Sequence, residues 1–405
     1  MGIAAAARAF AVVGRLRPLP FALLFAVLLA SVVWLYGGLE ASWSRHPPGL
    51  VNPGGNPIGR DFVAFWSASS LALAGHPVAP YDPILLSAAE RDAIGVPVGF
   101  FAWFYPPIFL LLALPLAAMP YLVALGLWLV APFIAFARLL RRVAPHPLAP
   151  AAAFFFPGTA QCLISGQNGI LSAALVTGGL LHLERRPVVA GLFFGTLSYK
   201  PQIAAAAFAA LLFGRHWRTL GTALATVVAL AAASIAVLGV APWIAFLAHA
   251  GDARIALETG QLPWDRMVTV FAAARLAGAD IGTSYALHGI VAVAALAALV
   301  HVWRQPAPLA LRGTALVLAI PLVTPFAYDY DLVILLLAIA WLLQAGVATG
   351  FRRGEIALLV LAWVSPVAGW LFAQWSHALL TPLVIALLLA ATLRRVAPAS
   401  ALAAA

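Results

Sequence analysis

The side chains best suited to chemistry in this chain are a few acids and amides set among long apolar stretches. Asp61 follows Arg60 and opens a helical pattern over 61–74, which carries Trp66 on its apolar face. A carboxylate here could accept a proton from a reacting hydroxyl group. It could equally cap the helix, because Asp is a preferred N-cap residue. Spacing alone leaves both interpretations open.

Two aromatic residues mark the same region. Tyr81 and Asp82 stand directly before a proline, and there the pattern favours Asp82 as the cap of a helix over 83–92. Tyr105 stands before two prolines, which are tolerated in the first turn of a helix. Tyr105 therefore marks a helix start, with a hydroxyl group available for binding.

Polar residues recur at later breaks in the apolar sequence. Gln167 and Asn168 lie between glycines, where they could form a turn or bind sugar hydroxyls. Lys200 lies away from the cytoplasmic face, where a charge at bilayer mid-depth costs about 2.5–3.5 kcal/mol, so it should either have an anionic partner or extend to the membrane surface. Asp329 and Asp331 alternate with tyrosines, and they could bound two helices or belong to a site.

The loop over 241–265 mixes aromatic with hydrogen-bonding side chains, as carbohydrate grooves do. Tryptophan in such a loop is equally typical of a membrane anchor. The residues concerned are Trp243, His249, Asp252, Arg254, Glu258, Gln261 and Trp264.

Several cofactor classes are not expected. The single cysteine, Cys162, excludes a disulfide framework, thiolate zinc sites and iron–sulfur clusters. No histidine stands four residues from a carboxylate, and P-loop and dinucleotide-binding motifs are missing from the sequence. We expect no cofactor and no metal site, although Asp61, Asp329 and Asp331 could bind a divalent metal if they converge.

The elements that position these residues follow from composition. The chain has 405 residues, of which 64% are hydrophobic and only 9% charged, and its mean hydropathy is +1.01. A soluble domain has about a quarter charged residues. The sequence therefore predicts an all-α polytopic membrane protein, embedded in the lipid bilayer.

Basic clusters predict the topology. With about 20 apolar residues per span, the chain can cross and return between successive clusters, which gives about twelve transmembrane helices. We expect a cytoplasmic N-terminal arm (1–18), one membrane domain (19–395) with a long first periplasmic loop (about 40–120), and a disordered cytoplasmic tail (396–405). Both termini are then cytoplasmic. The first span, about 19–37, is too long for a cleavable signal peptide and no cleavage site follows it.

The charge distribution supports this topology. On it, 16 basic residues and two acids face the cytoplasm, against seven basic residues and eleven acids on the other side. The net charge of +10 is thus the positive-inside bias of a membrane protein and not a nucleic-acid surface.

Three segments interrupt the regular spans. The stretch 105–121 is short and rich in proline, so we expect a juxtamembrane helix there that ends at Pro120. The stretch 188–213 should be broken at 199–202, and broken backbone at membrane depth is tolerated only where it is buried in protein or lines a cavity. The stretch 148–183 should form two helices, separated at 165–169.

The order of these motifs resembles glycosyltransferase family 87, the polyprenol-phosphate-mannose-dependent mannosyltransferase-like membrane proteins of the GT-C fold. The resemblance spans roughly residues 20–345. It rests on Gly-Arg-Asp61-Phe, Tyr81-Asp82, Tyr105-Pro-Pro, Gly-Gln167-Asn168, Lys200-Pro and the late acidic motif. Many relatives carry a histidine beside that last motif, whereas 328–331 contain none.

The resemblance implies an activity and residue roles. The enzyme would transfer a hexose, mannose by analogy, from a polyprenyl-phosphate sugar donor to a glycan or glycolipid acceptor, with inversion, at the periplasmic face of a bacterial inner membrane. Asp61 would be the general base, and Lys200 with Arg60 would bind the donor phosphate. Candidate sugar and acceptor contacts are Trp66, Tyr81, Asp82, Tyr105, Gln167, Asn168, Asp329 and Asp331.

Other classes compete with this interpretation. A transporter or flippase of a lipid-linked or small polar substrate would also have broken helices and buried polar groups. Against it, the sequence contains no inverted repeat, and its polar residues gather at one face instead of midway. A scaffold protein would not explain an acidic cluster opposite Lys200. Oligosaccharide polymerases and ligases usually have their large outer loop later in the chain.

Overall fold

Helices form every regular element of residues 18–396, the part of the chain that the computed structural model describes. Side-chain surroundings are described from residue 26 onward. The predicted N-terminal arm and C-terminal tail lie almost wholly outside these residues. Within the described residues, extended pairing is limited to three isolated β-bridges.

Six helices are long and apolar enough to cross a membrane. They are α2 (Pro18–Trp43), α6 (Tyr121–Val143), α12 (Trp217–Leu238), α16 (Ile281–Arg304), the continuous η5–α18 segment (Asp329–Ile334 and Leu335–Thr349) and α19 (Glu355–Ser376). Shorter apolar helices accompany them: α3 (Phe62–Leu73), α5 with η2 (Pro107–Ala113 and Leu114–Ala118), α9 (Gly169–His182), α10 with η3 (Pro187–Thr196 and Leu197–Tyr199), α11 (Pro201–Phe213) and α17 (Leu309–Val323). The multi-pass membrane architecture is therefore confirmed, and the count of twelve spans stays a prediction.

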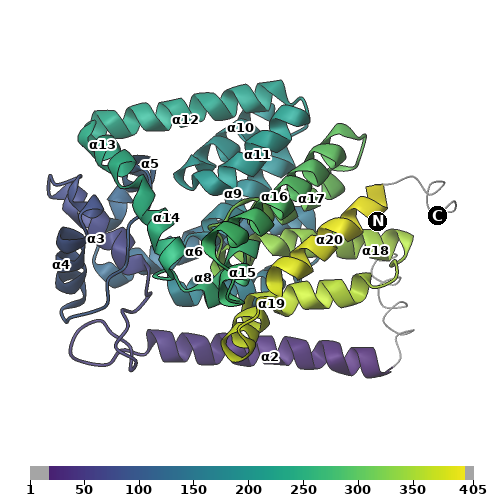
Figure 1. Ribbon diagram of the computed structural model, residues 1–405, viewed down its shortest axis with the longest axis horizontal. Coiled ribbons are helices and arrows are strands. Elements are labelled where there is room, and N and C mark those ends of the chain that lie inside the picture. Colours follow the sequence, from purple (N-terminus) through teal and green to yellow (C-terminus); the bar gives the residue numbers. More distant parts are fainter. Residues whose placement is uncertain (1–17, 397–405) are drawn as a thin grey trace.

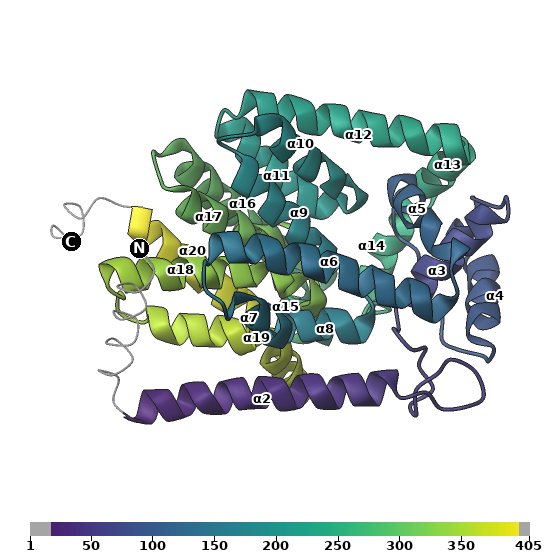
Figure 2. The same ribbon diagram turned by 180° about the vertical axis from the view of Figure 1, so that it is seen from behind.

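Helices α2, α12 and α19 run along the long axis of the molecule, with α2 along one edge and α12 along the opposite edge (Figure 1). The first loop, which includes α3, α4 (Pro83–Ile94) and α5, lies at one end beside α13 (Ala241–Ala248), as the reverse view also shows (Figure 2). At the other end α2 begins and α20 (Thr381–Val396) ends.

Ion pairs join cytoplasmic-side segments, as assigned from charge, that are distant in the sequence. Arg312, near the start of α17, pairs with Glu184 in the loop after α9. Arg395, in the last turn of α20, pairs with Glu355 at the start of α19. Each contact brings together segments that the charge analysis assigned to the same side of the membrane.

The predicted interruptions occur, and one more is present. The segment before Tyr121 forms the short α5 and η2, and η3 separates α10 from α11 just before Lys200, as expected. The prediction of two helices over 148–183 is wrong, because the chain breaks there twice and not once. Three helices are present: α7 (Ala149–Phe155), α8 (Pro157–Ser165) and α9. The extra break falls before Pro157, because proline has no amide hydrogen to continue a helix.

An aromatic core joins the first loop to the membrane helices. The ring of Phe65 packs edge-to-face against Phe109 and Trp128, with distances between ring centroids of 5.1 and 5.6 Å. Trp103 stacks on Phe109 at 5.4 Å. Offset and edge-to-face aromatic pairs each contribute about 0.5–1.5 kcal/mol beyond the area they bury. This core fixes the start of α3 relative to α5 and α6.

Candidate active site

Asp61 lies immediately before α3, but it does not cap that helix. Its backbone is helical, and its side chain makes no capping hydrogen bond. Instead Oδ2 accepts a hydrogen bond of 2.8 Å from the side-chain amide of Gln167, which lies in the turn between α8 and α9. The capping interpretation is therefore wrong for Asp61. Its carboxylate faces a polar environment away from its own helix.

Two glycine turns bring Asp61 and Gln167 together. Gly59 and Arg60 both have positive φ, +79° and +40°, and Gly166 has φ +64°. A Cβ on Gly166 would lie 2.1 Å from the carbonyl oxygen of Gly59, so only glycine permits this approach. The Asp61 amide then donates to the Ser165 carbonyl at 3.1 Å, which joins the two turns.

Burial and the neighbouring side chains shift the pKa of Asp61 in opposite directions. Protein encloses the carboxyl, and this burial raises its pKa above the ordinary value, while Arg266, the Gln167 amide and Arg60 act in the opposite direction. A carboxylate whose pKa is raised toward the working pH is a better general base than an ordinary aspartate.

Arg266 is the neighbouring residue that the sequence analysis missed. It ends the turn η4 (Trp264–Arg266), and its guanidinium binds both oxygens of Asp329 at 3.0 Å. It also donates to the Ser165 hydroxyl at 3.0 Å. Asp329 is 1% exposed and accepts a further hydrogen bond of 2.9 Å from Gln161. Asp329 thus orients Arg266 and does not itself reach a substrate.

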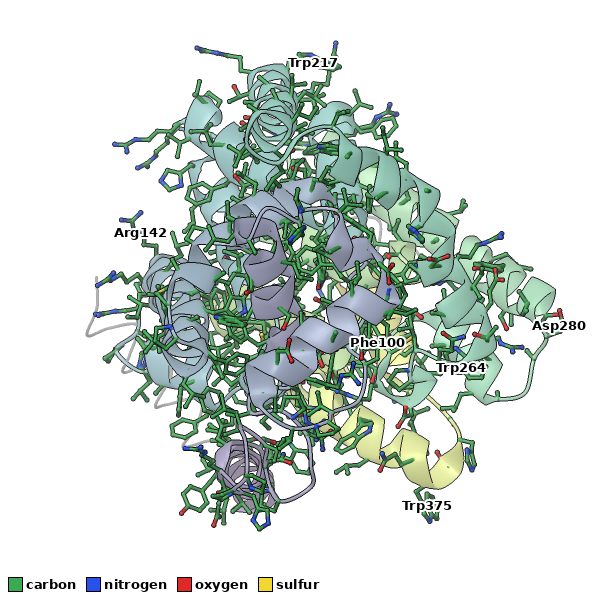
Figure 3. All side chains as sticks on the ribbon, turned by 90° about the vertical axis from the view of Figure 1, so that its left-hand side faces the viewer. Phe100, Arg142, Trp217, Trp264, Asp280 and Trp375 are labelled. Atoms are coloured by element: carbon green, nitrogen blue, oxygen red, sulfur yellow. The ribbon has the colours of Figure 1, made fainter. Side chains whose placement is uncertain are left out.

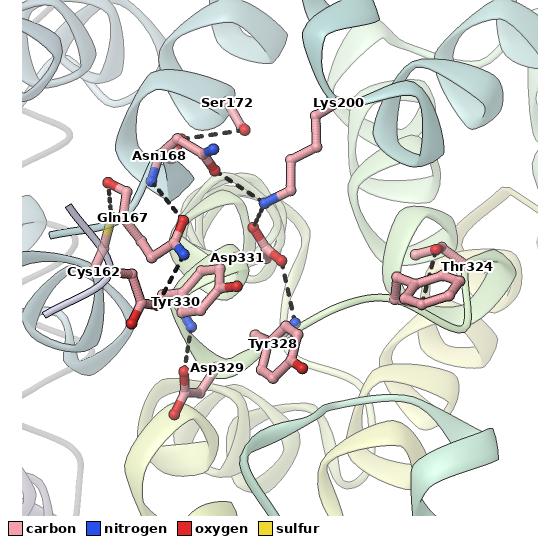
Figure 4. Close-up of polar contacts among 12 residues, drawn as sticks. Cys162, Gln167, Asn168, Ser172, Lys200, Thr324, Tyr328, Asp329, Tyr330 and Asp331 are labelled. Carbon is pink, nitrogen blue, oxygen red and sulfur yellow. Dashed lines mark hydrogen bonds and ion pairs between the residues drawn. The ribbon is translucent and has the colours of Figure 1, made fainter. Parts of the chain in front are cut away.

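Lys200 has an anionic partner, as the sequence led us to expect. Its ammonium pairs with Asp331 and donates to Asn168 at 3.0 Å (Figure 4). Asp331 also accepts a 3.1 Å hydrogen bond from the Tyr328 amide. Lys200 and Asp331 are 3% and 5% exposed. Buried pairs of this kind neutralise each other, so little of the Lys200 charge is left for a ligand.

Asn168 and Tyr105 connect the Lys200 pair to Asp61. The Asn168 amide donates to the Tyr105 hydroxyl at 2.9 Å, and Tyr105 lies within 3.5 Å of the Gln167 side-chain oxygen. The resulting polar network runs from Asp331 through Lys200, Asn168 and Gln167 to Asp61.

Several of these groups line one cavity of about 910 Å³. Its walls come from the first loop, the breaks at 167 and 199–202, α14 (Ala250–Thr259), η4 and the 326–331 turn. Phe100 belongs to this wall and lies on the face turned toward the viewer in Figure 3. The volume suits a ligand of several tens of atoms.

Seven of the predicted site residues line the cavity: Arg60, Asp61, Tyr81, Tyr105, Gln167, Lys200 and Asp331. Asn168 and Asp329 lie behind that wall, in hydrogen-bonding contact with it. Trp66 and Asp82 do not line it. The Trp66 indole donates to the Met119 carbonyl at 3.1 Å, and Asp82 caps α4 through the amides of Ile84 and Leu85. We do not carry these two residues into the proposed site.

The acids of the site do not form a metal cluster. Among the described residues, no three His, Cys, Asp or Glu side chains are placed to bind one metal ion. Asp329 and Asp331 each have a cationic partner, Arg266 and Lys200.

The fold and the cavity define a multi-pass membrane protein with one cavity that several charged and polar side chains line. The family model of glycosyltransferase family 87 matches residues 103–325, just over half of the chain. The chain belongs to glycosyltransferase family 87 and is a membrane glycosyltransferase. The match excludes Asp61 but includes Tyr105, Gln167, Lys200 and Arg266. No curated protein and no solved structure is significantly similar to it.

Proposed function

We propose that this enzyme transfers a hexose, mannose by family analogy, from a polyprenyl-phosphate sugar to a glycan or glycolipid acceptor. The reaction takes place at the periplasmic face of a bacterial inner membrane. The acceptor hydroxyl attacks the anomeric carbon, its proton moves to Asp61, and the bond between that carbon and the phosphate oxygen breaks. Polyprenyl phosphate leaves, and a single displacement inverts the anomeric configuration.

The observation that carries the proposal is the position of Asp61. Its carboxylate lines the cavity, does not cap its helix, and is oriented by Gln167. A general base must lie within hydrogen-bonding distance of the proton that it accepts, and contributes about 10²–10⁴-fold to the rate. A cavity-lining carboxylate held by one side-chain amide supports this role, because a bound hydroxyl could approach its free oxygen.

The donor phosphate is better assigned to Arg60 than to Lys200. Arg60 lines the cavity beside Asp61. Its Nε atom is buried and makes no hydrogen bond within residues 18–396. Lys200 already has Asp331 and Asn168 as partners, and Arg266 already has Asp329 and Ser165. Guanidinium groups bind phosphate in a fixed bidentate geometry and can stabilise the charge that develops on the leaving group.

A transporter or flippase was the alternative at the level of sequence. Membership of a glycosyltransferase family supports the enzyme instead.

The test is a transfer assay with purified protein in bilayer nanodiscs, radiolabelled polyprenyl-phosphate mannose and an extract of membrane glycolipids. We expect label in a glycolipid product with free polyprenyl phosphate released in equal amount, and NMR of that product should show an inverted anomeric centre. Movement of intact donor across liposomes without bond cleavage would contradict the proposal. Parallel donors with glucose or galactose decide the sugar.

A further inference from the structure

The loop over 241–265 has no part in the chemistry described so far, yet it forms one wall of the cavity. His249 and Asp252 line that wall, at and just after the corner between α13 and α14. The His249 Nδ1 and Asp252 Oδ2 atoms are 2.8 Å apart, and both side chains are about half exposed. This pair offers a hydrogen-bond donor and acceptors to any ligand in the cavity.

A side chamber of about 120 Å³ adjoins the main cavity beside this pair. Its walls are mostly aromatic: Tyr81, Trp103, Phe104 and Phe246, together with His249. Tyr81 and Phe246 meet edge to face at 6.3 Å. Trp103 is 4% exposed, and its indole nitrogen is buried without a hydrogen-bond partner within residues 18–396.

The lining of the chamber is distinct from the proposed phosphate site. His249 lines the chamber, whereas Arg60, Asp61 and Arg266 line the main cavity only. A sugar ring in the chamber would therefore contact neither the residue assigned to the donor phosphate nor the proposed base.

Asp61 is linked to the chamber by hydrogen bonds. The Tyr81 hydroxyl, in the chamber wall, donates to the Tyr105 carbonyl at 3.0 Å. The Tyr105 hydroxyl contacts Gln167, which holds Asp61. Tyr105 and Gln167 therefore connect the wall of the chamber to Asp61.

We propose that Tyr81, Phe246 and His249, with Asp252, form a subsite for a pyranose ring of the acceptor. The apolar C–H face of the ring would pack on the aromatic side chains, and its hydroxyls would bind the His249–Asp252 pair. A hydrocarbon chain fits less well, because it would cover this polar pair without giving it hydrogen bonds. The inference rests on the proposed function, since it assigns the second substrate of that reaction.

The test is saturation-transfer NMR of the protein in nanodiscs with methyl α-D-mannopyranoside, methyl β-D-glucopyranoside and methyl β-D-galactopyranoside as probes, and cyclohexanol as an apolar ring. We expect transfer to at least one glycoside. His249→Ala and the milder Phe246→Leu should each weaken that binding at least about fivefold. His76→Ala removes an exposed histidine of the first loop outside the cavity and should leave binding unchanged. Thermal unfolding of each variant confirms that it is folded.

The outcomes separate this inference from the proposed function. Wild-type glycoside binding in both His249→Ala and Phe246→Leu would overturn it, as would cyclohexanol binding in place of the glycosides. Asp61→Asn should keep glycoside binding while it loses transfer. Undiminished transfer in Asp61→Asn would overturn the proposed function and leave the subsite standing.

Discussion

Lys200 shows at the scale of one residue how burial distinguishes a structural cation from one that binds a ligand. The sequence indicated that this lysine needed an anion, and phosphate was one candidate. The structure supplies Asp331 instead, and leaves Arg60 with a buried nitrogen that has no partner among the described residues. Which anion lies near a cation depends on the packing of distant segments, so the pattern of residues along the chain could not decide it.

Variants of the two cations should therefore behave differently. Lys200→Met leaves Asp331 buried and unpaired, so we expect a loss of about 3–5 kcal/mol in stability. The double variant Lys200→Met/Asp331→Leu should recover most of it. Arg60→Gln should keep the thermal midpoint and raise the donor KM at least about tenfold. Thermal unfolding and donor titrations check both, and equal destabilisation by Arg60→Gln would contradict the assignment.

Glu90 on α4 gives a prediction for pH. It is fully buried and accepts one 3.2 Å hydrogen bond, from the Phe101 amide in the loop that lines the cavity. Burial raises its pKa from an ordinary 4.5 to about 8. Between these values the folded state holds a proton that the unfolded state has lost, so stability falls as pH rises through this window.

Glu90→Gln removes this titration. The difference in thermal midpoint between Glu90→Gln and wild type should therefore move in favour of the variant by a few degrees from pH 5 to pH 9. The exposed Glu40→Gln is the matched control and should follow wild type throughout. Parallel curves for Glu90→Gln and wild type would show that Glu90 is not protonated in the folded protein.

At the scale of elements, the site is made by the ends of helices. Periodicity and prolines predicted α3, α4, α5 and the break before α11, because local sequence decides where a helix starts and stops. The break at Phe156 was missed although Pro157 is a local signal for it, because only the glycine-flanked turn at 165–169 was considered as an interruption of the apolar stretch 148–183. The contact between the turns at 59–61 and 165–167 was also beyond prediction, because it joins segments about a hundred residues apart.

Gly166→Ala tests that contact. The added methyl group would lie 2.1 Å from the Gly59 carbonyl oxygen, so the two turns must separate and Asp61 must shift. Displacement by about 1 Å can reduce a rate about 100-fold, and we expect a loss of that order in transfer. Gly126→Ala on α6 is the control, since a methyl group there meets no atom within 4 Å. Circular dichroism should show unchanged helix content in both variants.

At the scale of the whole molecule, composition and charge were enough to predict a multi-pass α-helical membrane protein. Hydropathy reports on lipid exposure directly, and Lys/Arg placement reports on sidedness. The number of crossings was harder to predict. Helices such as α10 and α11 are too short to span the bilayer alone, and their depth depends on packing against neighbours.

Sidedness can be measured with introduced cysteines, because the native Cys162 is buried. Asp92→Cys, in the exposed part of α4, should react with a membrane-impermeant maleimide in spheroplasts. Arg353→Cys, between α18 and α19, should react only after the membrane is opened. The reversed pattern would place the first loop in the cytoplasm and refute the periplasmic assignment.

The most direct measurement for the whole account is the transfer rate of Asp61→Asn compared with Asp92→Asn. The two changes remove the same charge from the same loop, but only Asp61 lines the cavity. We predict that Asp61→Asn loses at least about 100-fold in rate while it binds the donor and unfolds like wild type, and that Asp92→Asn keeps full activity. A wild-type rate in Asp61→Asn would contradict the central claim that this carboxylate is the base.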